Sequence, residues 1–269
     1  SDLAARIGAA LGRARAGVAD RLERALPPPE APVAGAVLLG LGLPDNLRAS
    51  FAGLGLAHLF ALSGLHVGII AGLGLLALRG LPLPAPRRGL VLIPALATYA
   101  LLVDLPGSVV RAVGLVSLAL LGPLAGRRVD TLRALGLVFW ANVLWRPACV
   151  LDVGVQLSYL AAGGIVAGQR VLGARTNSRF GRALAVPVCA QLATLPVVAR
   201  TFGVLPLWGP LVNLAVVPVF GAIVAMLAAG LLVSAVWPWA GEGLLATAAV
   251  GVRLVVAAAT TLVETESGS

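Results

Sequence analysis

Long apolar runs separated by short charged stretches make up most of the chain. Residues 49–78 contain no Asp, Glu, Lys or Arg, and neither do the 41 residues from 201 to 241. Further apolar segments cover 89–103, 112–126, 134–145, 153–169, 183–199 and 243–263. Because a helix needs about 20 residues to cross the hydrocarbon core of a bilayer, the pattern predicts an all-α, polytopic membrane protein with about eight transmembrane helices. Residues 31–43 are a candidate for a short re-entrant segment.

Several of these helices are expected to be broken. Eight prolines lie in or beside the apolar runs: Pro94, Pro106, Pro123, Pro187, Pro196, Pro206, Pro210 and Pro218. Backbone groups that a broken helix frees at membrane depth must face protein or a water-filled cavity. The pattern therefore favours an internal aqueous path over a solid helical bundle.

The first 26 residues follow a different pattern. Apolar residues recur every four or seven positions with arginines between them, namely Leu3, Ile7, Leu11, Val18 and Leu22. This spacing predicts an amphipathic helix that ends at the run Pro27-Pro28-Pro29. Such a helix either lies on a membrane surface or forms a solvated linker. We divide the chain into a helix and Pro-rich linker (1–30), a transmembrane domain (31–263) and a tail or remnant of cloning (264–269).

The composition excludes a water-soluble protein. Hydrophobic residues make up 59% of the 269 positions and charged residues only 12%, so the chain lacks the polar groups that a soluble surface needs. All 20 basic residues are arginine, and the formal net charge is +9. Arginines concentrate in 79–88, 127–133 and 170–182, which assigns these loops to the cytoplasm under the positive-inside rule. The same rule leaves both chain ends outside the cytoplasm.

Cysteine and histidine spacing gives no sign of a metal site. Cys149 and Cys189 lie far apart inside apolar stretches and are expected to be small buried hydrophobic residues. His58 and His66 are the only histidines, and their spacing fits no usual pair of metal ligands. We expect no metal and no cofactor.

Polar side chains inside apolar segments are the candidate functional residues, because each is costly in lipid. They either line or brace one polar cavity or act separately as contacts between helices. The set is His58, Ser63, His66, Arg111, Asp152, Gln156, Gln191 and Asn213. Arg111 needs a partner or water, and Asp104 or Asp152 could supply it. Asp152, Gln156 and Tyr159 share one helical face.

These segments also resemble a known family. The stretch G-L-A-H-L-F-A-L-S-G-L-H-V-G at 55–68 resembles the hallmark motif of the ComEC competence family. Five further stretches are similar to the family in the same order: R-R-V-D-T-L-R-A-L at 127–135, D-V-G-V-Q-L-S-Y-L at 152–160, Q-L-A-T-L-P at 191–196, F-G at 202–203 and N-L-A-V-V-P at 213–218. One departure is Gly40-Leu41-Gly42, where relatives often have a glycine followed by charged residues.

The resemblance implies a multi-pass channel in the bacterial inner membrane that passes single-stranded DNA into the cytoplasm during natural transformation. It implies an external DNA receptor and a cytoplasmic helicase-type ATPase as partners, besides membrane lipid. Longer relatives usually add an OB-fold domain and a metallo-β-lactamase-like nuclease domain. Two histidines cannot supply the nuclease motif H-x-H-x-D-H, so we expect no enzymatic activity from this chain.

An external Arg-rich helix would suit that function, because basic surfaces gather the phosphates of single-stranded DNA. The candidate residues for this surface funnel are Arg6, Arg13, Arg15, Arg21 and Arg24. Two alternatives come from other classes. An intramembrane serine hydrolase would use Ser63 with a histidine, and a small-solute secondary transporter would use the same interrupted helices and buried polar residues.

Overall fold

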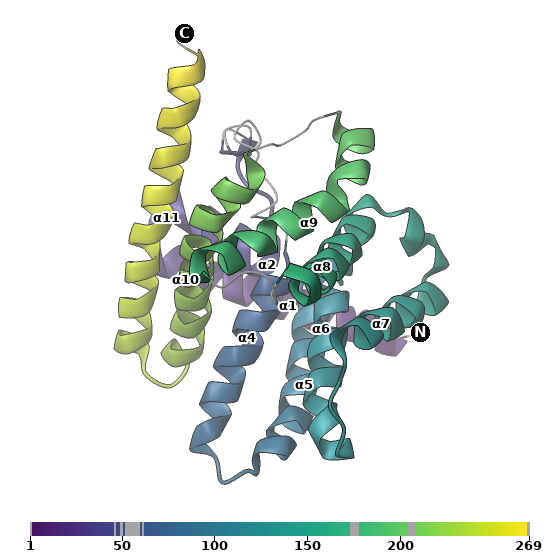
Figure 1. Ribbon diagram of the computed structural model, residues 1–269. Coiled ribbons are helices and arrows are strands. Elements are labelled where there is room, and N and C mark those ends of the chain that lie inside the picture. Colours follow the sequence, from purple (N-terminus) through teal and green to yellow (C-terminus); the bar gives the residue numbers. More distant parts are fainter. Residues whose placement is uncertain are drawn as a thin grey trace. The chain divides into compact units, whose positions relative to one another are not determined.

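The computed structural model describes residues 2–45, 47–48, 51, 60, 62–172, 178–203 and 208–267, and every regular element in these ranges is helical (Figure 1). The elements are α1 (Asp2–Ala25), α2 (Glu30–Leu39), α4 (Gly64–Ala77), η2 (Leu78–Gly80), α5 (Ala85–Leu102), α6 (Gly107–Leu121), η3 (Gly122–Ala125), α7 (Thr131–Trp145), η4 (Pro147–Leu151), α8 (Val153–Leu172), α9 (Arg179–Phe202), α10 (Gly209–Ser234) and α11 (Pro238–Ser267). The predicted all-α class is confirmed, and each of the eight apolar segments contains a helix that the structure describes, α4 to α11.

Fewer helices than expected are long enough to cross a membrane. Four of the described helical stretches combine the necessary length with an apolar composition: Gly107–Ala125, Arg179–Phe202, Gly209–Ser234 and Pro238–Ala258. Helices α4 and α7 have 14 and 15 residues, and at 1.5 Å per residue they are shorter than the roughly 30 Å hydrocarbon core. The predicted number of about eight full-length spans is therefore too high for the described part of the chain.

The prolines inside helices do not interrupt them. Helix α9 runs through Pro187 and Pro196, and α5 and α10 run through Pro94 and Pro218. A proline removes one backbone hydrogen bond, and a long apolar helix can lose one such bond without ending. The interruptions expected at these positions are therefore not helix ends, because each helix continues past its proline.

The chain forms two compact units. Unit 1 comprises 1–77, 95–106 and 219–269, and unit 2 comprises 78–94 and 107–218. Two boundaries between the units fall inside helices: one within α5, directly after Pro94, and one within α10, directly after Pro218.

Helix α2 forms the centre of unit 1. Nine of its ten residues are buried, and it contacts both α1 and α11. The predicted amphipathic helix at the N-terminus is confirmed as α1, which buries Leu22 near its end and exposes Arg6, Arg13, Arg21 and Arg24. Because α1 packs on α2 and α11, it is part of unit 1 and not a solvated linker.

Helix α11 runs back alongside the second half of α10 within unit 1 (Figure 1). Small residues allow the close approach: a Cβ atom added to Gly241 would lie 2.3 Å from the Ser234 side chain, and one added to Gly230 would lie 2.8 Å from Leu245. Such small-residue contacts are typical of helix pairs in membranes, where backbones approach closely.

Unit 2 contains α6, α7, α8 and α9 together with the first parts of α5 and α10, and α8 and α9 form its most extensive helix pair. Gly164 and Gly168 on α8 form a G-x-x-x-G spacing that faces Cys189 and Ala193 of α9. A Cβ at Gly164 would lie 2.5 Å from the Cβ of Ala193, and one at Gly168 would lie 2.2 Å from the Cys189 sulfur. The two helices are therefore in contact through glycine backbone.

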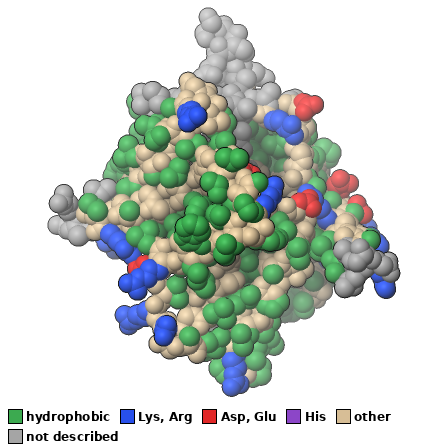
Figure 2. Space-filling model, turned by 90° about the vertical axis from the view of Figure 1, so that its right-hand side faces the viewer, with side chains coloured by type: hydrophobic (Ala, Val, Ile, Leu, Met, Phe, Trp, Pro, Cys, Tyr) green, Lys and Arg blue, Asp and Glu red, His purple; other side chains and the backbone are tan. Residues whose placement is uncertain are grey.

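Large apolar side chains cover much of the surface. Figure 2 shows hydrophobic side chains over much of the displayed face, with charged side chains in small groups between them. All five tryptophans are between 62% and 74% exposed: Trp140, Trp145, Trp208, Trp237 and Trp239. Four of them lie at or next to a helix end. Exposed tryptophans near helix ends are characteristic of the membrane–water interface.

Candidate functional site

Arg111 is the centre of a polar cluster that joins three helices of unit 2. Its Nε donates a hydrogen bond of 2.8 Å to the Ser158 hydroxyl on α8, and its guanidinium lies 5.9 Å from the centre of the Tyr159 ring. The Tyr159 hydroxyl accepts a 2.9 Å hydrogen bond from the Asn142 amide on α7, and Phe139 packs edge-on against the same ring. The Arg111 side chain of α6 is therefore held against α8 by a hydroxyl group and an aromatic ring.

Neither predicted carboxylate pairs with Arg111. Asp104 forms an ion pair with Arg15, and Asp152 is exposed and accepts a 3.1 Å hydrogen bond from the Val155 amide, which caps the start of α8. The ion pairs among the described residues do not include Arg111. Asp152 begins a helix, so its carboxylate satisfies the free N–H groups of that helix.

Gln156 also supports the start of α8. Its side-chain amide donates a 2.8 Å hydrogen bond to the Val150 carbonyl in η4. Of the three residues expected to share a face, Tyr159 therefore belongs to the Arg111 cluster, whereas Asp152 and Gln156 stabilise the turn between η4 and α8. Sequence reasoning did not find Ser158 or Asn142 as partners, because no spacing rule links positions on different helices.

Ser63 and His66 form a pair at the start of α4 in unit 1. The Ser63 amide and hydroxyl both lie within reach of His66 Nδ1, at 3.2 and 3.1 Å, and His66 is buried against Phe220. A side chain three residues into a helix that accepts the N–H of the capping residue is the geometry of a capping box. The pair therefore stabilises the start of α4, and the serine hydrolase alternative is not favoured.

The remaining cavity candidates are distributed over the chain. His58 lies outside the described residues. Gln191 and Asn213 are half-buried on α9 and α10 in unit 2. Ser63 and His66 belong to unit 1, whereas Arg111, Asp152, Gln156, Gln191 and Asn213 belong to unit 2. The single shared cavity stays a prediction.

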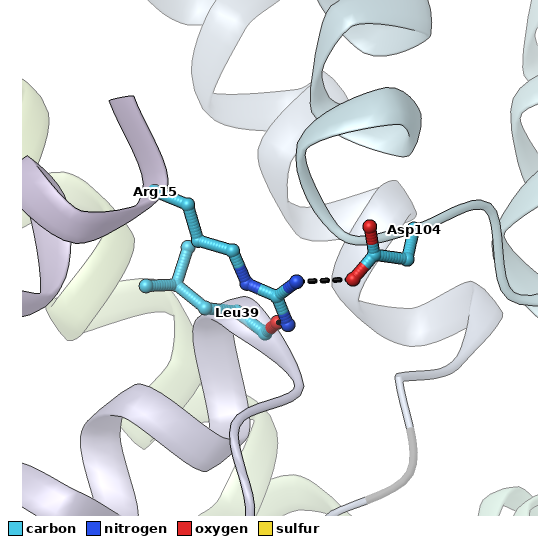
Figure 3. Close-up of polar contacts among 3 residues, drawn as sticks. All are labelled: Arg15, Leu39 and Asp104. Carbon is cyan, nitrogen blue, oxygen red and sulfur yellow. Dashed lines mark hydrogen bonds and ion pairs between the residues drawn. The ribbon is translucent and has the colours of Figure 1, made fainter. Parts of the chain in front are cut away.

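Two arginines of the predicted surface funnel hold unit 1 together. Arg15 forms an ion pair with Asp104 and donates a 3.0 Å hydrogen bond to the Leu39 carbonyl at the end of α2 (Figure 3). Arg21 donates a 2.8 Å hydrogen bond to the Ser234 carbonyl at the end of α10. A cation at a helix C-terminus also interacts favourably with the helix dipole. Arg6, Arg13 and Arg24 are exposed, and a role for them in DNA binding stays a prediction.

A further ion pair in unit 1 was not expected from the sequence. The Glu30 carboxylate, at the start of α2, is 1% exposed and accepts a 2.5 Å hydrogen bond from Arg253 of α11. The two residues are 223 positions apart, so no local spacing in the sequence predicts that they pair. In the ranges that the structure describes, no three His, Cys, Asp or Glu side chains gather as a metal site would require.

A comparison with known protein families gives a match over most of the chain. Residues 41–268 match the family described as competence protein. The chain belongs to the competence protein family. The match begins directly after α2 and includes all four long apolar helices. The arginines of α1 precede it.

Two curated members of the family are similar to this chain. ComE operon protein 3 of Bacillus subtilis (strain 168) is 28% identical over 198 residues, which cover 72% of this chain and 25% of that protein. Competence protein ComA of Neisseria gonorrhoeae is 32% identical over 197 residues, which cover 69% of this chain and 28% of that protein. The chain thus spans about a quarter of the length of these relatives. No solved structure shows a significant match.

Proposed function

We propose that this chain is a multi-pass channel in the bacterial inner membrane that carries single-stranded DNA into the cytoplasm during natural transformation. Membership of the competence protein family supports this proposal most directly, because the match extends over the apolar helices that would form the channel. The exposed tryptophans near helix ends suit a protein surrounded by lipid.

Arg111 is the residue best suited to meet the DNA backbone. A charge within an apolar span must face protein or water, since facing lipid costs at least about 2.5–3.5 kcal/mol. Here the neighbours are a hydroxyl and an aromatic ring, which orient the guanidinium without neutralising it. A planar guanidinium is well suited to bind phosphate oxygens. A phosphate in the channel would thus find a positioned and uncompensated positive charge.

Because the chain spans about a quarter of the length of its relatives, we propose that it works as one part of a larger assembly. An external DNA receptor would deliver the strand, and a cytoplasmic helicase-type ATPase would draw it inward. OB-fold and nuclease domains would belong to other parts of the full-length protein, and this chain would contribute the path and no catalysis.

The test is uptake of labelled DNA by a naturally transformable host that carries Arg111→Gln in the full-length protein. We expect uptake to be lost while protein level and thermal stability change little, and Arg111→Lys to restore part of it because it restores the charge. Arg146→Gln, at an exposed position between α7 and η4, is the matched control and should retain uptake. Normal uptake by Arg111→Gln would exclude this role. Normal transformation by a host that lacks the whole chain would exclude the proposed function.

A further inference from the structure

A cavity of about 350 Å³ lies beside the C-terminal end of α2 in unit 1. Its lining consists of the loop Gly40–Leu43 together with Arg48, Phe51 and Phe60. Its volume falls within the range of small-molecule sites, about 300–1,000 Å³. None of these residues belongs to the polar set predicted from the sequence.

The backbone of the loop is fixed at its N-terminal end, where it leaves α2. Gly40 ends α2 in the left-handed region, with φ of 66°, and its N–H donates to the Ala36 carbonyl. A Cβ at this position would lie 2.8 Å from Leu62, so the site requires glycine. The preceding carbonyl, that of Leu39, accepts the hydrogen bond from Arg15 (Figure 3). The end of the cavity wall next to α2 is thus held by two hydrogen bonds and a left-handed glycine.

Aromatic rings pack together at the cavity. The rings of Phe51 and Phe60 are 4.5 Å apart, those of Phe60 and Phe220 are 5.7 Å apart, and His66 continues the series against Phe220. Phe51 and Phe220 are buried, whereas Phe60 is partly exposed. Three of the six phenylalanines of the chain therefore meet here, and Phe60 is supported from behind by two fixed rings.

Arg48 supplies the positive charge of the cavity. It is exposed, and a Cβ at Gly42 would lie 3.4 Å from its Nη2, so the guanidinium lies against the glycine backbone. The ion pairs that join described residues do not include Arg48. The cavity thus combines one guanidinium that forms no ion pair with a described residue, one supported aromatic ring and open backbone.

We propose that this cavity, the Arg48 pocket, holds one nucleotide of the translocated strand, with its phosphate at Arg48 and its base against Phe60. Sites for single-stranded nucleic acid combine these two elements, because every base has a face that can stack and every nucleotide has a phosphate. The inference rests on the proposed function and adds a binding subsite in unit 1 to it. A site that binds phosphate alone would not require the aromatic ring of Phe60.

The test measures binding of a fluorescent thymidine oligonucleotide to the purified full chain in nanodiscs, by anisotropy, over a series of salt concentrations. We expect Arg48→Gln to weaken binding and to reduce the slope of log Kd against log salt by about 0.7, the value for one phosphate contact with a single strand. We expect Phe60→Leu to weaken binding about tenfold at every salt concentration, since it removes one stacked base.

Matched controls and a second ligand make the result decisive. Arg87→Gln and Phe202→Leu change exposed residues of unit 2 and should leave binding unchanged. An abasic oligonucleotide, which keeps the phosphates, should bind wild type about tenfold more weakly and should not distinguish wild type from Phe60→Leu. If Phe60→Leu weakens the abasic ligand equally, Phe60 does not act by stacking on a base and the proposal is wrong.

The failure of this proposal differs from that of the proposed function. If wild type binds the thymidine oligonucleotide and both pocket variants bind it equally well, the Arg48 pocket is excluded while the channel function stands. If wild type does not bind, both are excluded. Should Phe60→Leu fail to fold, the salt slope of Arg48→Gln decides, because an exposed arginine can be replaced without disturbing the core.

Discussion

The contact between α8 and α9 predicts that Gly164→Ala destabilises the protein, although alanine favours helices over glycine. The added Cβ would lie 2.5 Å from the Cβ of Ala193 and 2.7 Å from the Cys189 carbonyl oxygen. Backbone and a Cβ cannot rotate away as a long side chain can. The two helices must therefore separate by roughly 1 Å to restore an ordinary carbon–carbon contact distance of about 3.5 Å.

The magnitude follows from two opposing effects. Overpacking of a well-packed site costs about 1–3 kcal/mol, and replacing a helical glycine by alanine gains up to about 1 kcal/mol. We therefore expect the free energy of unfolding to fall by about 1–2 kcal/mol. Gly163, one position earlier on α8, provides the matched control, because a Cβ there would meet only Leu135 at 3.7 Å. Gly163→Ala should be neutral or stabilising.

The assay is unfolding of the purified variants in mixed detergent micelles, followed by circular dichroism. A second variant, Gly164→Val, should be less stable than Gly164→Ala, since its side chain is larger. Stability of Gly164→Ala equal to that of Gly163→Ala or of wild type would refute the close contact between these helices.

Three further predictions concern a pH effect, a loop and an activity. The Arg133 backbone N–H and the Arg170 guanidinium lower the pKa of Asp130, which lies between the apolar segments. Its stabilising effect should be complete above the ordinary aspartate pKa of about 3.9 and lost as the pH falls through the lowered value. Asp130→Asn should therefore reduce Tm at pH 7, and the reduction should shrink progressively as the pH falls below about 3.9. A reduction of the same size at every pH would contradict this. Gly40→Ala should lower the free energy of unfolding by at least about 1–2 kcal/mol, because an L residue is strained at this positive φ. Gly42→Ala is the control and should lower the free energy of unfolding by less, since Gly42 has no positive φ and its nearest neighbour would be 3.4 Å away. Equal melting curves for the two variants would argue against a strained loop at Gly40. Purified chain with Mg²⁺ or Mn²⁺ should leave DNA intact in a gel assay, and metal-dependent degradation would show a nuclease that the two histidines do not suggest.

Much of the helical architecture could be predicted from the sequence. Hydrophobic runs are a local signal, and each of the eight apolar segments contains a helix. The amphipathic spacing from Leu3 to Leu22 likewise predicted α1. Among the described residues the number of full-length spans was overestimated, because the length of an apolar run does not fix the length of the helix within it. The run 49–78 contains α4, which has only 14 residues.

The partners of the polar residues could not be predicted. Arg111 was expected to pair with a carboxylate, since opposite charges attract, yet Asp104 pairs with Arg15 and Asp152 caps a helix. Both outcomes depend on which helix faces which, and local spacing carries no information about that. The aromatic cluster around Phe60 was missed for the same reason. The average aromatic content of 5% suggested little stacking, whereas the fold gathers three phenylalanines in one place.

Because α2 is short, it restricts which residues related sequences can have at the positions that contact its C-terminal end. Ten residues rise about 15 Å, half the thickness of the hydrocarbon core. If unit 1 is embedded in a bilayer, at least one end of α2 is remote from bulk water, where a helix would otherwise satisfy its last carbonyls. The Tyr99 hydroxyl donates to the Leu38 carbonyl, and Arg15 donates to that of Leu39. In related sequences we therefore expect positions 15 and 99 to carry long side chains that can donate a hydrogen bond. A relative with an aliphatic residue at either position would need a donor from a neighbouring helix instead.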